Sequence, residues 1–352
     1  MARRNIEAAI QASKELELDG KLLPCSVPSS YSRLESYKDI HSNEEIDGVY
    51  SLQYSPDGSV LAVGTGNEAM RLYETSSGKH IVDLRKPRYG GYPVTSLQWH
   101  PYDHHILFAA TCQGNVYAMN TEDHTCKTVV KERKNEINCL DFSEDGSAFA
   151  TSGKDLAVRI YDTKTCTLTQ SYEGYRQERP QGETDVQGHG MRVFALKYSP
   201  QNSHILITGG WDNHLKVWDT RSTDGVKRTI GGPHICGDSL DIKGFQILTG
   251  SWVAQNSLQI WDYSSGKLIK NVPYPDNGNG EYLYVAQFCE NETVIAGGSG
   301  TNSLKAINTN SGEVLGEIGL DEKCVQAVDS TRGGQVVAVG GQLDTVKTGV
   351  IS

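Results

Sequence analysis

The sequence predicts an all-β protein in which seven repeated units, each of four short strands, close into a ring. Three observations support this prediction. Unit starts within the 352-residue chain are separated by 45, 43, 56, 44, 46 and 42 residues. Each unit combines the alternating pattern of a half-buried strand with a short, fully apolar run. The last unit lacks a fourth strand, whereas a segment with fourth-strand character precedes the first unit.

The first two strands are the most regular part of the repeat. Apolar residues occupy the first, fourth and sixth positions, then a turn and a buried apolar run follow. Turns such as Asp57-Gly58 and Asp145-Gly146 supply residues that tolerate positive φ at tight reversals. Three copies are degenerate. The seven units begin at Val49, Val94, Ile137, Val193, Gly237, Leu283 and Val325.

The third and fourth strands follow with their own turn chemistry. Third strands read VRIYDT, LKVWDT or LQIWDY, and turns such as SSGK and NSGE lead to the fourth. The interval of 56 residues contains an insertion over residues 172–185, which is polar, contains Gly and Pro, and is typical of a long exposed loop. These elements predict four antiparallel strands in every complete unit.

The seventh unit ends at Ser352, at the close of its third strand. The segment SRLESYKDI, residues 32–40, has the character of the missing fourth strand. Pairing the two would close the ring and remove the open sheet edges that otherwise recruit other chains. We therefore expect one domain over residues 32–352, a seven-bladed β-propeller.

The chain resembles the WD-repeat β-propeller family over this range. Its most specific segment is Gly188-His189 followed about thirty residues later by Trp218-Asp219. The resemblance implies a buried hydrogen-bonded tetrad in the fourth blade, because a buried imidazole, carboxylate and indole N–H need mutual partners. The four residues that it assigns are His189, Thr208, Asp212 and Trp218.

Other blades depart from the family pattern. Blade three has Arg133 where the histidine is expected, although it keeps Asp155 and a Tyr161-Asp162 ending. Blade five keeps Trp261-Asp262 without a Gly-His pair. We expect these blades to be held mainly by packing.

Composition and charge exclude several classes of protein. With 33 Lys and Arg against 43 Asp and Glu, the formal charge of −10 argues against a general nucleic-acid binder, although a local basic patch remains compatible with it. No run of 18 apolar residues and no signal peptide are present, so we expect no membrane contact. The 8 Cys form no C-x-x-C pair, which favours a reducing, cytoplasmic location.

Three patterns of catalytic or ligand-binding chemistry have simpler structural explanations. His189 and Asp212 have the groups for general base catalysis, but the tetrad accounts for them and no nucleophile accompanies them. The run Gly64–Ala69 matches a loose dinucleotide fingerprint, but a strand and not a helix follows it. His104-His105 has no further metal ligands at fixed spacing. We expect no enzyme activity, no cofactor and no metal.

Large aromatic residues in turns indicate a surface for protein partners. Trp211 and Trp252 fall between the second and third strands of blades four and five, where exposed indoles are costly unless they are used. The alternative is that each indole folds down onto its neighbouring blade. Loops on the same face carry the other candidates for partner contact, Arg192, Tyr282, Tyr89 and Tyr92.

An N-terminal arm precedes the ring. Residues 1–22 are expected to form it, with a weakly amphipathic helix within 2–18 that needs a surface on which to settle.

The sequence favours a non-catalytic scaffold, a monomeric propeller that binds other proteins within a larger assembly. Two narrower alternatives remain open. The box from Trp218 to Arg221 fits the W-D-x-R pattern of WD-repeat substrate receptors of cullin-RING ubiquitin ligases, with Arg221 as the contact to the ligase adaptor. A compact propeller with an N-terminal docking helix also suits a component of ciliary, flagellar or cytoskeletal assembly.

Overall fold

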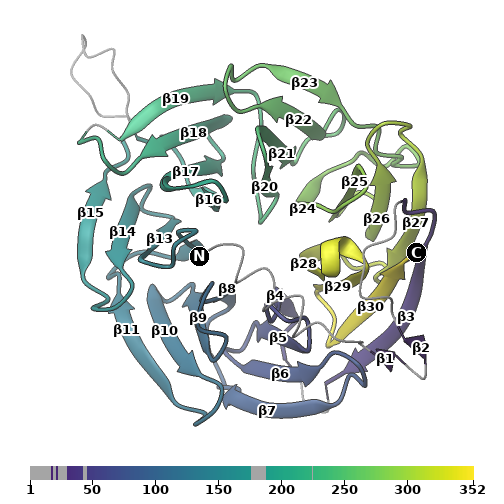
Figure 1. Cartoon of the computed structure of the whole chain (residues 1–352), viewed down its shortest axis with the longest axis horizontal. Coiled ribbons are helices and arrows are strands. Elements are labelled where there is room, and N and C mark those ends of the chain that lie inside the picture. The colour runs from purple at the N-terminus through teal and green to yellow at the C-terminus, as the bar shows by residue number, and fades with distance from the viewer. Residues whose placement is uncertain (1–16, 19–20, 23–29, 43–45, 176–187, 224) are drawn as a thin grey trace.

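Seven four-stranded antiparallel sheets surround a central axis in the computed structural model (Figure 1). The structure describes residues 17–18, 21–22, 30–42, 46–175, 188–223 and 225–352. Strand order within a blade follows chain order, with the first strand nearest the axis. The predicted all-β, seven-bladed architecture is confirmed.

The strands fall where the repeat places them. Blades one to four comprise β4 (Val49–Tyr54), β5 (Val60–Thr65), β6 (Met70–Glu74), β7 (His80–Arg85); β8 (Val94–Trp99), β9 (Ile106–Thr111), β10 (Asn115–Asn120), β11 (Cys126–Lys131); β12 (Ile137–Phe142), β13 (Ala148–Gly153), β14 (Val158–Asp162), β15 (Leu168–Tyr172); and β16 (Val193–Ser199), β17 (Asn202–Gly210), β18 (His214–Asp219), β19 (Val226–Gly231). Blades five to seven comprise β20 (Leu240–Lys243), β21 (Gln246–Gly250), β22 (Leu258–Asp262), β23 (Leu268–Asn271); β24 (Leu283–Phe288), β25 (Thr293–Gly298), β26 (Ser303–Asn308), β27 (Val314–Gly319); and β28 (Val325–Thr331), β29 (Val336–Gly341), β30 (Thr345–Ile351) with β3 (Leu34–His41). A single 3-10 turn, Arg332–Gly334, joins β28 to β29.

The N-terminal strand closes the ring. β3 pairs antiparallel with β30, from Leu34 opposite Ile351 to His41 opposite Thr345. The backbone N–H of Ser352 also donates to the carbonyl of Arg33 at 2.9 Å. The closure predicted from the missing fourth strand is confirmed, and the paired strand extends one residue beyond the expected 32–40.

The apolar core lies between blades, in seven clusters. In one cluster, Val158 and Tyr172 of blade three pack with Leu196 and Trp218 of blade four. Because each second strand is buried almost throughout, its apolar side chains contact both neighbouring sheets. A blade is therefore stabilised by its neighbours, and the ring positions the loops on its two faces.

The predicted N-terminal helix requires a correction where the chain is described. Glu17–Leu18 and Lys21–Leu22 are β1 and β2, a short antiparallel pair, so the helical pattern does not reach Leu18. The sequence between them, Asp19-Gly20, is a dipeptide that favours tight hairpin turns over helix. The rest of the predicted arm, 1–16, and most of the insertion, 176–187, lie outside the described residues. In the described part of the chain, no helix has the length and apolarity to cross a membrane.

Candidate functional site

One face of the ring carries the loops that lead into each blade and the turns between second and third strands. We call it the loop face. The first residue of the turn repeatedly donates its N–H to the leading loop of its own blade, as Trp211 does to Arg192 and Trp252 to His234, at 3.0 and 2.8 Å. Equivalent bonds join Cys112 to Pro93 and Lys154 to Glu136. The loop face is therefore a continuous, internally bonded surface.

The structure brings the four tetrad residues of blade four together. His189 in the leading loop contacts Asp212 through Nδ1 at 2.9 Å and Thr208 Oγ1 through Nε2 at 2.6 Å. The indole N–H of Trp218 donates to the same Thr208 oxygen at 2.7 Å. The chain of bonds ties the loop to β17 and β18.

The electrostatics of the tetrad suit a structural role. Burial lowers the pKa of His189, against the opposing effect of Asp212, and keeps the imidazole neutral. Burial alone would raise the pKa of Asp212, but the contacts with His189 and the Gly190 N–H together outweigh it and lower that pKa. Oδ2 of Asp212 also accepts the Gly190 N–H at 3.0 Å. The carboxylate therefore fixes the leading loop of blade four.

Blade three corrects the expectation that it is held mainly by packing. The buried Glu132, not the exposed Arg133, takes the place of the histidine. Its carboxylate accepts hydrogen bonds from Thr151, from Tyr161 at 3.0 Å and from Arg159 at 3.0 Å. The blade therefore replaces the neutral imidazole with a charged network, which a search for Gly-His cannot detect.

Blade five keeps half of the tetrad. The indole N–H of Trp261 donates to Thr249 Oγ1 at 3.0 Å, which matches the Trp218 to Thr208 bond of blade four. The side chain of Glu281, from the leading loop of blade six, accepts the N–H of Ser257 at 2.6 Å and so fixes the turn that begins at Trp252. Packing is thus supplemented by hydrogen bonds here as well.

Trp211 lies half-exposed on the loop face, with 37% of its surface accessible. Its ring packs against Phe194 at 5.0 Å between centroids, and the guanidinium of Arg192 lies 5.8 Å from the indole centroid. The indole N–H donates to Cys236 Sγ at 2.9 Å. Phe194 is a site residue whose only signal in the sequence is an aromatic side chain at the second position of the first strand.

Trp252 has a similar environment in blade five. It is 40% exposed and its ring lies 5.2 Å from that of Tyr282, between centroids. Both tryptophans also contact one leading loop, since Trp252 donates to His234 and Trp211 to Cys236. The structure thus pairs Trp211 with Arg192 and Trp252 with Tyr282, and leaves a face of each indole open.

The two remaining candidates lie elsewhere on the loop face. Tyr89 is fully exposed and Tyr92 is 46% exposed, both in the leading loop of blade two. They belong to a different sector from the tryptophans of blades four and five (Figure 1, between β7 and β8).

Arg221, the residue of the W-D-x-R box, is held by its own turn. Its Nε and Nη2 donate to the two carboxylate oxygens of Asp219 at 2.9 and 2.8 Å. Lys227 contacts the same carboxylate. These contacts lower the pKa of Asp219 well below its usual range, the bond from Arg221 being the largest cause.

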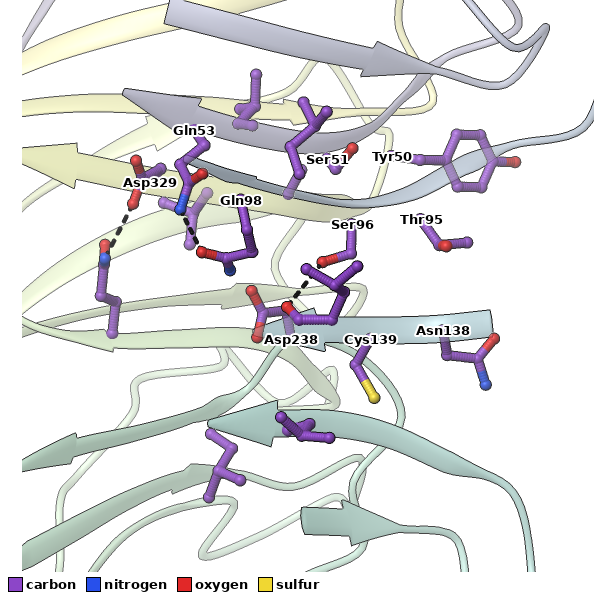
Figure 2. A pocket seen from close by; sticks show the side chains of 18 of the residues that line it. Tyr50, Ser51, Gln53, Thr95, Ser96, Gln98, Asn138, Cys139, Asp238 and Asp329 are labelled. Carbon is purple, nitrogen blue, oxygen red and sulfur yellow. Dashed lines mark hydrogen bonds between the residues drawn. The ribbon is translucent and has the colours of Figure 1, made fainter. Parts of the chain in front are cut away.

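A polar ring around the central channel was not found from the sequence. The fifth residue of each repeat unit is polar, and six of these seven residues line the channel: Gln53, Gln98, Lys197, Asp241, Gln287 and Asp329. The seventh is Asp141. In Figure 2, Gln53 and Gln98 point toward one another in the channel, and Gln53 Nε2 donates to Gln98 Oε1 at 2.7 Å. The signal was available, because polar residues recur at one position of an otherwise apolar frame.

The ring joins neighbouring blades. In four pairs of neighbouring blades, an Asp or Gln side chain at the fifth position accepts the backbone N–H of the sixth residue in the next blade. Tyr198 donates to Asp141 at 2.7 Å and Tyr54 donates to Asp329 at 2.7 Å. Trp99 and Gln53 make the same contact at 2.6 Å.

Desolvation shapes the charges of this channel. Burial raises the pKa of Asp141 and of Asp329 to about 6. Burial would lower the pKa of Lys197, but the carboxylates of Asp238 and Asp141 outweigh it and raise that pKa. Lys197 is therefore a fixed cation among titratable acids.

The described residues contain no group of three or more potential metal ligands of the His, Cys, Asp and Glu types. His105 of the sequential histidine pair contacts Glu122 at 3.5 Å in an exposed turn. Gly64 lies in β5 and Met70 begins β6, so the glycine run 64–69 spans a strand end and a turn.

Comparison with known proteins supports the fold and gives its class. The family profile described as "WD domain, G-beta repeat" matches residues 124–162 and 181–219. A second profile, "Anaphase-promoting complex subunit 4 WD40 domain", matches residues 31–101. With seven four-stranded blades and the His189 to Trp218 hydrogen bonds, these matches show that the chain belongs to the WD-repeat β-propeller family.

Among curated proteins the chain is similar to "Cell division cycle 20.4, cofactor of APC complex" of Arabidopsis thaliana, 26% identical over 274 residues. That match covers 76% of this chain and 57% of the relative. "Anaphase-promoting complex subunit cdc20" of Dictyostelium discoideum is 24% identical, covering 72% of this chain and 47% of the relative. "Ribosome biogenesis protein WDR12 homolog" of Drosophila yakuba is 24% identical, covering 68% and 59%. The chain thus spans about half to three fifths of the length of these relatives.

Proposed function

We propose that the protein is a non-catalytic scaffold of the cytoplasm that binds other proteins through its loop face, as a single propeller within a larger assembly. The observation that carries the proposal is the pair of half-exposed, braced indoles, Trp211 and Trp252. Tryptophan buries a large area with few rotatable bonds, so indoles that are already positioned lose little entropy on binding.

The residues around Trp211 and Trp252 complete the proposed binding surface. Arg192 beside Trp211 donates to Glu136 at 2.8 Å, so an ion pair borders the aromatic surface. Tyr282 supports Trp252 from the leading loop of blade six. An aromatic centre with a polar border is the usual composition of a protein interface.

The relatives favour an adaptor over an enzyme. Two of them are named as a cofactor or subunit of the anaphase-promoting complex, and a third as a ribosome biogenesis protein. We therefore propose that this chain also serves a multi-subunit assembly. The narrower ligase-receptor function gains no support from Arg221, whose guanidinium is bonded to Asp219 on two atoms.

Affinity purification of the intact protein tests the proposal. The double variant Trp211→Ala, Trp252→Ala should lose partner proteins identified by mass spectrometry, with each truncation weakening binding by about 2 kcal/mol. A matched control, Tyr102→Ala with Phe245→Ala, removes two aromatics that are 50% and 63% exposed in turns between first and second strands, on the opposite face. Loss of partners in the control, or retention in the double variant, would contradict the proposal.

Acrylamide quenching separates binding from packing. The other three tryptophans, Trp99, Trp218 and Trp261, are at most 7% exposed. Quenching in the free protein should therefore report Trp211 and Trp252, and partner binding should reduce it. If the double variant instead melts at a much lower temperature while its folded fraction keeps full affinity, the indoles serve packing alone.

A further inference from the structure

Cations concentrate on one sector of the loop face although the chain carries a net charge of −10. The leading loops of blades two and three, with the strand ends that precede them, hold six of them, Arg85, Lys86, Arg88, Lys131, Arg133 and Lys134. Two buried acids accompany them, Glu68 and Glu132, whose side chains are 1% and 3% exposed. A third acid, Glu136, is 33% exposed and is paired with Lys154 and Arg192. The negative charge of the sector is therefore buried or paired, whereas cations face outward.

Both buried acids make internal hydrogen bonds. Glu68 accepts from Arg85 at 2.9 Å and from the Tyr117 hydroxyl at 2.8 Å. The network around Glu132 described above takes up both of its oxygens. Four exposed cations, Lys86, Lys131, Arg133 and Lys134, make no ion pair with any described residue.

The turn over residues 132–135 fixes two of these cations. Asn135 donates its backbone N–H to the Glu132 carbonyl at 3.2 Å and its side-chain amide to the Glu132 carboxylate at 2.6 Å. Both end residues are buried, so the central residues Arg133 and Lys134 are the ones exposed. Lys134 adopts φ 68°, as the third residue of a tight turn.

A second turn in the leading loop of blade two presents aromatic rings. Gly91 donates to the Arg88 carbonyl at 2.8 Å, and the Arg88 N–H donates to Asn67 at 2.9 Å. Tyr89 is fully exposed at the turn's outer corner, with Gly90 at φ 67° beside it. Since blades two and three are adjacent, the two turns lie on neighbouring loops of the same face (Figure 1, after β7 and after β11).

A groove leads away from the cationic turn between the outer strands of blades two and three. Lys131 and Arg133 line it together with the mutually paired Glu132 and Arg159. Val129 and Leu168 also line it, and Leu168 is 52% exposed. The groove thus places a few apolar side chains beside the unpaired cations. We infer that the leading loops of blades two and three bind an acidic, extended protein segment, with carboxylates on Arg133 and Lys134 and an apolar side chain in this groove.

The inference rests on the proposed function and names the chemistry of one partner for the same face. Charge complementarity selects an acidic occupant, and the apolar side chains of Val129 and Leu168 within the groove favour a peptide over a nucleic acid, whose phosphates need a longer cationic track. The two turns are already fixed by internal bonds, so binding requires little reordering.

Fluorescence anisotropy with a defined peptide tests the inference without a cellular partner. The probe is a fluorescein-labelled dodecapeptide in which Glu alternates with Leu and Ser, and its control carries Gln at every Glu position. The charge reversal Arg133→Glu, Lys134→Glu should weaken binding of the Glu peptide at least tenfold. The matched control Lys164→Glu, Lys267→Glu makes the same change in charge at two exposed cations in turns on the opposite face and should bind as the unmodified protein does.

The result that supports the inference is salt-sensitive binding of the Glu peptide, weak binding of the Gln peptide, and loss only in the loop-face reversal. Absence of Glu-peptide binding overturns it, as do equal losses in both reversals or tighter binding of a single-stranded twelve-nucleotide DNA. Trp211→Ala with Trp252→Ala should leave peptide affinity unchanged. Failure of the peptide titration with loss of cellular partners in the tryptophan variant would reject this inference and keep the proposed function.

Discussion

At the scale of single residues, hydrogen bonds within the tetrad of blade four compensate for the burial of its polar groups. His189 is fully buried, and each of its ring nitrogens has one partner. The imidazole is thus satisfied only while Asp212 and Thr208 remain in place.

Replacing Asp212 with Ala should therefore lower the free energy of unfolding by about 1 to 3 kcal/mol, because a buried N–H of His189 loses its acceptor. Urea unfolding of the intact protein measures this. The variant Trp218→Phe removes the donor to Thr208 and leaves a cavity at a fully buried side chain, so it should also destabilise the protein. Full stability of Asp212→Ala combined with the loss of a specific activity would contradict the structural role.

Glu132 gives a second residue-scale prediction. Glu132→Ala should destabilise the protein by about 3 kcal/mol or more, because Arg159 would remain largely buried with one of its carboxylates gone. Arg133→Ala, one residue away and exposed, should change stability by less than about 0.5 kcal/mol. Equal effects of the two substitutions in thermal or urea unfolding would show that Glu132 does not replace the missing histidine.

At the scale of elements, the sequence predicts strands well and their polar contacts poorly. Every first strand begins at or near its expected residue, because alternation and turn residues are local signals. The place of Glu132 depends on Thr151, Arg159 and Tyr161, which are 19 to 29 residues away in the chain. The exposure of Trp211 likewise depends on Phe194 and Arg192, so a pattern within one segment cannot give it.

The closing strand yields an element-scale prediction. Deleting residues 1–40 removes nearly all of β3 and exposes the edge of β30, so solubility should fall sharply and the melting temperature should drop. Deleting residues 1–20 leaves β3 in place and should change neither. Calorimetry and sedimentation of both truncated proteins give the comparison, and identical melting of the longer deletion and the intact chain would contradict a stabilising closure.

At the scale of the whole molecule, the polar residues of the channel link the first strands of several neighbouring blades. Its acids have pKa values near the range of cellular pH, since burial raises those of Asp141 and Asp329 to about 6. For a carboxyl group raised in the folded state, the folded protein binds more protons than the unfolded chain. The stability that Asp329 contributes is therefore fully present below pH of about 4 and is lost as pH rises through about 6.

Asp329→Asn should remove this dependence. Relative to the unmodified protein, the variant should gain about 1 to 3 kcal/mol between pH 4 and pH 7. The asparagine oxygen can still accept from Tyr54, and rotation of the Gln287 amide, whose Oε1 has no partner, supplies an acceptor for the new amide. Urea unfolding from pH 4 to pH 8 measures the difference, and a pH-independent offset would refute the titration of Asp329.

The pairing of β3 with β30 also has a consequence in time. Residues 41 and 345 form one end of this pairing, so about 300 residues are synthesised after β3 before its partner strand exists. At about 5 to 20 residues per second, β3 waits on the order of 15 to 60 s beside the growing chain. Its charged residues are the exposed Glu35 and Asp39 and the half-buried Lys38, and such residues discourage pairing with a wrong edge. The charged residues that face solvent at the outer edge of the closed ring would therefore also protect the incomplete ring from wrong pairing during translation.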